Sequence, residues 1–133
     1  MKAETRERRL AAVWFADIVG FTGLSSRDED AALRLIESFQ AITRRVVAES
    51  GGTVVKFLGD GGLAVFPSAD GAVRAGLAAQ RCFKSGTAAT GNAARLRVGI
   101  HLGEVVSAPD GDVYGDGVNT AARIQREAEP SCI

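Results

Sequence analysis

The 133-residue sequence is poor in the residues that build disulfides and zinc sites, and it carries no net charge. Its two cysteines, Cys82 and Cys132, have no metal-ligand or redox spacing, so they fit a reduced intracellular chain without a disulfide framework. The single histidine, His101, stands at the end of a predicted strand and is interpreted as structural, because one histidine makes no metal site. The 16 basic residues are balanced by 16 acidic ones, which argues against a nucleic-acid partner bound by a broad basic face, but not against a small polyphosphate.

Long apolar runs are also missing. The sequence has no stretch of about 18 apolar residues, so no membrane segment is expected. The lead-in over residues 1–9 is charged and lacks the apolar core of a signal peptide, and its arginines, Arg6, Arg8 and Arg9, are interpreted as a solvated charge run. We therefore expect one cytoplasmic domain, or the cytoplasmic part of a larger protein.

The first half of the chain predicts a strand followed by a helix. The nearly continuous apolar run over residues 10–17 is typical of a strand buried on both faces, with Asp17 at its carboxyl end. A tight loop follows. A helix is then expected to begin at Ser26, because Glu29 stands at the capping-box spacing, and to end at the glycine pair 51–52.

Residues 54–66 predict a hairpin, two short apolar strands joined by the turn LGDGG. Gly59, Gly61 and Gly62 would supply the positive φ angles of this turn. The remaining elements are a helix over 70–84, a surface loop over 85–94, two strands bent at Gly103 over 96–106, a loop over 108–117 and a helix over 118–129.

The first six elements predict an α+β fold, a ferredoxin-like βαββαβ sandwich with a mainly antiparallel sheet and helices on one face. In such a unit the first and third strands are neighbours. Asp17, at the end of the first strand, would then lie beside Asp60 in the hairpin turn. The chain reaches residues 130–133 where a new strand would begin.

Two neighbouring carboxylates repel each other unless a cation lies between them. A pair with oxygen ligands alone suits Mg²⁺ or Mn²⁺ better than zinc, and leaves positions for water and substrate phosphates. Two such ions can activate an attacking hydroxyl and stabilise a leaving pyrophosphate. Seen in its own stretch alone, Asp60 is better interpreted as a plain turn aspartate, and only the predicted neighbourhood of Asp17 favours a metal ligand.

A third polar cluster lies in GDVYGDGVNTAARIQ, residues 111–125. Asn119 and Arg123 are four residues apart on a predicted helix and share a face, which suits a sugar and a phosphate. An exposed polar helix face explains the same pattern. Asp112 and Asp116 lie in the preceding loop, and Asp116 is also a candidate N-cap.

Three motifs, FADIVGFT (15–22), KFLGDG (56–61) and VYGDGVNTAAR (113–123), together resemble the class III nucleotide cyclase catalytic domain. More narrowly, the chain is similar to bacterial adenylate cyclases with GDVYGDGVN. The resemblance covers residues 10–133, and because the family domain continues with further strands and a helix, the domain is expected to be incomplete at its C-terminus. It implies an enzyme that makes 3′,5′-cyclic AMP and pyrophosphate from ATP by attack of the ribose 3′-hydroxyl on the α-phosphate.

The resemblance also implies which residues hold metal and base. Asp17 and Asp60, with the backbone carbonyl of Ile18, would hold two Mg²⁺ or Mn²⁺ ions. Lys56 and Asp112 would read the base, because a lysine donor and an aspartate acceptor suit N1 and the 6-amino group of adenine. Guanine presents the opposite pattern.

The remaining implied roles concern the ribose and the phosphates. Asn119 would orient the ribose, and Arg123 would stabilise charge developing in the transition state. Phe21, Thr22 and nearby backbone N–H groups would cradle the β- and γ-phosphates. In the family the site lies between two subunits, so the metal aspartates would come from one chain and the base, ribose and arginine residues from the other. A homodimer with two equivalent sites is therefore expected.

Two other functions stay open. The chain is also compatible with a catalytically silent regulatory domain that binds ATP or dimerises. A diguanylate cyclase has a related fold, but its hairpin carries GG, two acids and a phenylalanine, whereas LGDGG carries one acid.

Overall fold

The structure, a computed structural model, describes residues 7–88 and 94–130. Residues 1–6, 89–93 and 131–133 lie outside it, and with them Arg6, Cys132 and part of the loop predicted over 85–94. The elements, in chain order, are β1 (Glu7–Ile18), α1 (Phe21–Arg27), α2 (Glu29–Glu49), β2 (Thr53–Leu58), β3 (Gly61–Phe66), α3 (Ala69–Ala88), β4 (Leu96–Ser107), β5 (Val113–Tyr114) and α4 (Asp116–Glu127).

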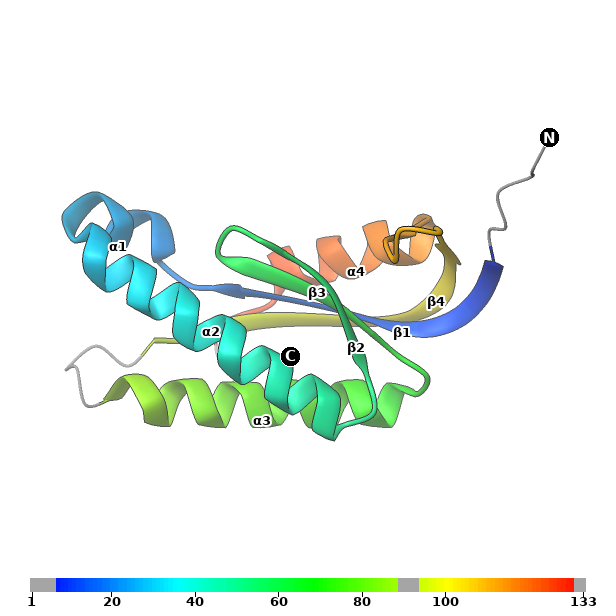
Figure 1. Ribbon diagram of the computed structural model, residues 1–133, viewed down its shortest axis with the longest axis horizontal. Helices are drawn as coiled ribbons and strands as arrows, with labels where there is room; N and C mark the ends of the chain where they lie inside the picture. Colours follow the sequence, from blue (N-terminus) through cyan, green and yellow to red (C-terminus); the bar gives the residue numbers. More distant parts are fainter. Residues whose placement is uncertain (1–6, 89–93, 131–133) are drawn as a thin grey trace.

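The strands form one antiparallel sheet in the order β2-β3-β1-β4-β5. β1 lies between β3 and β4, as the ferredoxin-like prediction requires, so the predicted fold class is confirmed. Helices α2 and α3 run side by side over one face of the sheet, and α4 lies on the opposite face against β4 and β1 (Figure 1). None of the described helices has the length and hydropathy needed to cross a lipid bilayer.

β1 is buried on both faces, as its apolar run predicts. Ala12, Trp14 and Ala16 belong to the core cluster beneath α2 and α3. Ala11 and Val13 belong to a second cluster, which includes residues of α4. Since successive side chains of a strand point to opposite faces, β1 forms the centre of both layers.

The sheet curls at one end. Residues 12–17 of β1 pair with β3 on one side and β4 on the other, whereas residues 7–11 pair with β4 alone. The free end of β1 and the end of β4 bend away together, and β5 adds to the edge of this ribbon (Figure 1). The loop before β5 is thereby carried over the sheet toward β2.

The predicted start of the first helix at Ser26 is wrong. The chain turns at Gly20, whose φ is 75°, into the short helix α1, and Ser26 lies inside it. α2 has Asp28 as its N-cap, and the Asp28 side chain accepts a hydrogen bond from the N–H of Ala31 at 3.0 Å. The predicted helix end is confirmed, because Gly51 follows α2 with a φ of 82°.

The glycines of the hairpin do not all serve the turn. The turn has two residues and begins at Gly59, which has a φ of 61°, whereas Gly61 and Gly62 lie in β3 without positive φ. A Cβ at Gly61 would lie 2.9 Å from the carbonyl oxygen of Ala16, and a Cβ at Gly62 would lie 3.2 Å from the ring of Phe57. These two glycines are needed for close packing rather than for backbone conformation.

Other boundaries also differ from the predictions. β1 begins at Glu7, inside the predicted lead-in, where Arg8 pairs with Glu104 and Arg9 with Ser107 on β4. α3 extends to Ala88, beyond the predicted residue 84. A local apolar pattern does not mark either extension. The added residues of β1 are held by pairing with β4, and those of α3 continue a helix that packs against the sheet.

β4 is one continuous strand, and the bend predicted at Gly103 is wrong. A Cβ at this position would lie 2.7 Å from Nε2 of His101 and 3.3 Å from the Cα of Gly117, so the glycine makes room for α4. His101 lies within β4 rather than at its end. The N-cap of α4 is Gly115, and Asp116 is the first helical residue, so the alternative of Asp116 as N-cap is also wrong.

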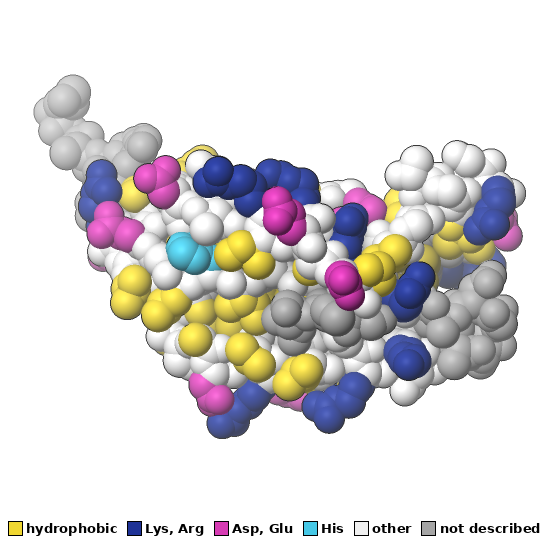
Figure 2. Space-filling model, turned by 180° about the vertical axis from the view of Figure 1, so that it is seen from behind, with side chains coloured by type: hydrophobic (Ala, Val, Ile, Leu, Met, Phe, Trp, Pro, Cys, Tyr) yellow, Lys and Arg dark blue, Asp and Glu magenta, His cyan; other side chains and the backbone are white. Residues whose placement is uncertain are grey.

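The surface carries several large apolar side chains. Val73 and Leu77 on α3 and Leu102 on β4 are all exposed. Seen from behind, apolar side chains gather in one part of the surface, with charged side chains along its margins (Figure 2).

Candidate functional site

Two aspartates meet at one end of the sheet. Asp17, near the end of β1, pairs with Gly61 of β3, and the N–H of Ile18 donates to the carbonyl oxygen of Asp60 at 3.0 Å. Burial raises the pKa of the Asp60 carboxyl; a backbone hydrogen bond opposes this rise, and the charge of Asp17 adds to it. The fold therefore brings together the two acids that the sequence analysis singled out.

The sequence analysis missed a basic partner of this pair, Arg97 on β4. It stands directly opposite Asp17 in the β1–β4 register. Its Nε lies 3.3 Å from Oδ1 and its Nη2 lies 3.1 Å from Oδ2 of Asp17. Its charge also lowers the pKa of Asp60, against the effect of burial. The one sequence signal for Arg97 was a charged residue in the apolar run LRVGIHLGEVV.

The donor set at this end of the sheet suits a hard cation. Among the residues that the structure describes, no group of three or more His, Cys, Asp or Glu side chains is placed to hold a metal. A cation held by Asp17 and Asp60 would therefore complete its coordination with backbone carbonyls, water or phosphate oxygens. Such an incomplete set of protein oxygens is typical of Mg²⁺ sites and fits Mn²⁺ as well.

A β-bulge in β2 aims Lys56 at the face of the sheet that carries α4. Val54 pairs with Ala64 and Lys56 with Leu63, so Val55 is an extra residue in β2. Val55 packs against the cluster that contains Leu63, and Lys56 stands opposite Leu63 itself. The extra residue places two consecutive side chains on one face.

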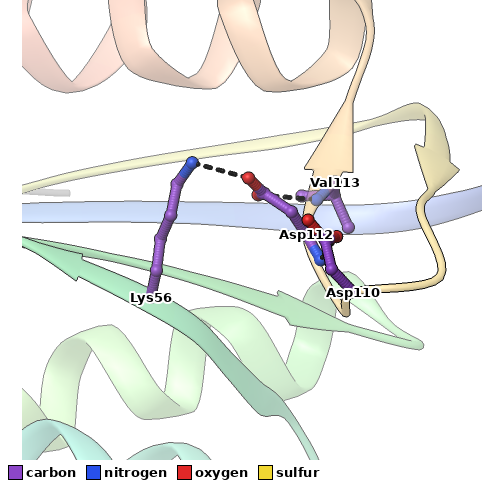
Figure 3. Close-up of polar contacts among 4 residues, drawn as sticks. All are labelled: Lys56, Asp110, Asp112 and Val113. Carbon is purple, nitrogen blue, oxygen red and sulfur yellow. Dashed lines mark hydrogen bonds and ion pairs between the residues drawn. The ribbon is translucent and has the colours of Figure 1, made fainter.

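Lys56 reaches Asp112, which precedes β5. Nζ of Lys56 lies 2.9 Å from Oδ2 of Asp112, and the two side chains are 40% and 21% exposed. Oδ1 of Asp112 accepts a hydrogen bond from the N–H of Val113, and the N–H of Asp112 donates to Asp110 (Figure 3). The hydrogen bond from Lys56 is the main cause that lowers the pKa of Asp112. The curl of the sheet thus brings together two residues 56 positions apart in sequence.

Asn119 and Arg123 lie on the outer side of α4. Ala121 and Gln125, between and beyond them, are buried against the sheet, whereas Asn119 and Arg123 are exposed. Within the described part of the chain, neither of these two side chains has a hydrogen-bond or ion-pair partner. The structure therefore does not bring them to the acidic pair of their own chain.

Phe21 and Thr22 are the first two residues of α1, three and four positions after Ile18. The ring of Phe21 packs against the core beneath α2 and α3. Thr22 is exposed, and its carbonyl oxygen accepts a hydrogen bond from the hydroxyl of Ser26 at 3.1 Å. The backbone N–H groups of the first turn of α1 have no helical acceptor, so they are the donors this segment offers.

The sequence profile of a family described as adenylate and guanylate cyclase catalytic domain matches residues 4–133. The chain is 38% identical over 133 residues to a putative adenylate cyclase 3 of Rhizobium meliloti, covering 98% of this chain and 22% of that protein. It is 42% identical over 122 residues to an adenylate cyclase of Streptomyces coelicolor, covering 91% of this chain and 30% of that protein.

Among solved structures, an adenylate/guanylate cyclase/hydrolase from Silicibacter pomeroyi superposes with a TM-score of 0.79 at 36% identity. The match covers 96% of this chain and 75% of the solved one. The chain spans less than a third of the length of the two relatives above.

Proposed function

The chain belongs to the family of adenylate and guanylate cyclase catalytic domains, the class III nucleotide cyclases, and from this premise we propose that it forms 3′,5′-cyclic AMP and pyrophosphate from ATP. The observation that carries the choice of ATP is the pairing of Lys56 with Asp112 at 2.9 Å. Relatives named adenylate cyclase support the same choice.

Lys56 and Asp112 offer a donor beside an acceptor on one face of the sheet. Adenine presents an acceptor at N1 beside a donor at its 6-amino group, so it can replace both halves of this ion pair at once. Guanine presents a donor at N1 beside a 6-oxo acceptor. In the same orientation, its N1–H donor would face the Lys56 donor and its 6-oxo acceptor would face the Asp112 acceptor. Unpaired polar groups of this kind reject the wrong base strongly.

At the turn of the hairpin, Asp60, together with Asp17 and the carbonyl of Ile18 on the neighbouring strand β1, would hold two Mg²⁺ or Mn²⁺ ions. When bound, such ions lower the pKa of the attacking 3′-hydroxyl and neutralise charge on the leaving pyrophosphate. The first backbone N–H groups of α1, at Phe21 and Thr22, would donate to phosphate oxygens, since helix N-termini favour anions.

Asn119 and Arg123 would act on the nucleotide held by a second copy of the chain. Both side chains point away from their own sheet and have no partner among the described residues. In a homodimer, Asn119 would orient the ribose, and Arg123 would stabilise the charge that develops on the phosphate in the transition state. Each site would then combine the acids of one chain with the base and ribose residues of its partner.

Mixing two inactive variants tests the shared site. Asp17→Ala and Arg123→Ala should each abolish cyclic AMP formation, and a mixture of the two should recover part of the activity, because one interface of the mixed dimer keeps an intact site. Arg126→Ala, which removes an exposed arginine of the same helix, should stay active and serves as the matched control. A mixture as inactive as its parents would refute the shared site.

A nucleotide assay tests the proposed substrate. With Mn²⁺, the purified chain should convert ATP and not GTP, at a specific activity that rises with protein concentration. Product from GTP alone would refute the role given to Lys56 and Asp112. Binding of ATP without any product would identify the chain as a catalytically silent nucleotide-binding domain instead.

A further inference from the structure

We infer that Arg97 is an internal counter-ion that occupies Asp17 in the free chain and must leave it when a cation binds. The inference rests on the metal site of the proposed function and adds a competitor to it. Arg97 would thereby set the affinity of the site for divalent cations.

The geometry shows why Arg97 and a cation compete. The guanidinium donates to both carboxylate oxygens of Asp17, at 3.3 Å and 3.1 Å. The side chains of Arg97 and Asp17 are 33% and 23% exposed, so most of the surface of each is shielded from water. A forked contact of this kind is among the stronger charge-assisted pairs. A divalent ion needs the same oxygens and cannot share them closely with a fixed positive charge.

The electrostatics of the acidic pair support this role. Arg97 is bonded to Asp17, and the backbone N–H of the next residue, Ile18, donates to the carbonyl oxygen of Asp60, so one positive charge lies beside the acidic pair, where a bound cation would lie. Among the described residues, no other basic side chain is bonded to Asp17, and none is bonded to Asp60. Arg97 is held opposite Asp17 by the β1–β4 register and not by a mobile loop.

Mn²⁺ binding to the nucleotide-free chain tests the inference, with free Mn²⁺ measured by electron paramagnetic resonance. Arg97→Met should raise the affinity for Mn²⁺ by about tenfold, the effect of removing one unit charge about 5 Å from a divalent ion in a water-like dielectric. Arg95→Met is the matched control, because Arg95 is an exposed arginine two residues away on the same segment. It should change the affinity less than about twofold, because among the described residues its side chain has no bond to Asp17 or Asp60, and salt screens charges that are not in contact.

The Mn²⁺ measurements distinguish failure of the counter-ion role from failure of the metal site. If Asp17→Asn removes Mn²⁺ binding but Arg97→Met leaves the affinity unchanged or weaker, the counter-ion role is wrong and the metal site stands. If the wild-type chain binds no Mn²⁺, or binds it independently of Asp17, both the metal site and the counter-ion role are wrong.

A second measurement uses the wild-type chain and does not depend on the folding of a variant. In ¹⁵N-labelled protein, Mg²⁺ should shift the Nε–H resonance of Arg97 and leave that of Arg95 in place, because only Arg97 loses its carboxylate partner. An unchanged Arg97 resonance at saturating Mg²⁺ would overturn the inference.

Discussion

Substituting Gly99 by alanine should lift α4 off the sheet. Gly99 lies on β4 beneath this helix, and a Cβ there would lie 2.3 Å from the backbone nitrogen, 2.5 Å from the Cα and 2.7 Å from the Cβ of Gln125. Ordinary contacts between carbon atoms are about 3.5–4.0 Å. Because the crowded atoms belong mainly to the helix backbone, no side-chain rotation relieves the clash, and α4 must move by roughly 1 Å.

The expected cost follows from this displacement. Overpacking of a well-packed core typically costs about 1–3 kcal/mol. For a chain of this length, such a loss lowers the melting temperature by roughly 3–15 °C. α4 also carries Asn119 and Arg123, and a misplacement of about 1 Å can lower a catalysed rate by roughly 100-fold. Thermal unfolding and the rate of cyclic AMP formation measure the two effects.

Gly86→Ala provides the control for this prediction. Gly86 lies in α3, and nothing lies within 4 Å of a Cβ built there. Alanine should leave the stability unchanged or raise it by about 0.5–1 kcal/mol, because glycine is a poor residue inside a helix. A Gly99→Ala protein that melts at the wild-type temperature would show that the contact between β4 and α4 is looser than the structure has it.

Two further predictions concern the charged pairs. Lys56→Met should lower the free energy of unfolding at pH 7 by up to about 1 kcal/mol, because the pair is partly exposed. Lys56 lowers the pKa of Asp112, so this contribution is present above the ordinary pKa of an aspartate and is lost as the pH falls through the lowered value. Denaturation of both proteins between pH 7 and pH 2 should therefore show the difference shrinking, and a difference that persists in acid would contradict the assignment. In the metal-free chain, Asp17→Asn should lower the melting temperature, because it removes the charged partner of Arg97. Asp60→Asn should raise the melting temperature slightly, because it removes a charge that burial and Asp17 both disfavour. Changes of the same sign in both variants, measured by calorimetry, would contradict this account.

The sequence predicted those features that local pattern and a topological rule determine. The apolar run of β1 indicated a strand buried on both faces, and the βαββαβ order made β1 and β3 neighbours. These two inferences place Asp17 beside Asp60, as the structure has them. The end of α2 before Gly51, which has a positive φ, followed from glycine chemistry in the same way.

The missed features depend on contacts between distant segments. Arg97 meets Asp17 because of the β1–β4 register, and no local pattern specifies that register. The bulge at Val55 cannot be read from a short apolar run, in which an extra residue looks like any other. The contact of Lys56 with Asp112 depends on the curl of the sheet. α1 escaped prediction because its seven residues include a glycine and show no apolar period.

The hairpin of β2 and β3 has a consequence for the two sites of the proposed dimer. Lys56 and Asp60 lie four residues apart on one hairpin with a two-residue turn. Asp60 would hold metal in one site, and Lys56 would hold the base in the other. A tilt of this hairpin as a rigid body would move both ligands together. Binding of substrate at one site would then be coupled mechanically to its partner, and the dimer would show cooperative kinetics rather than those of two independent enzymes.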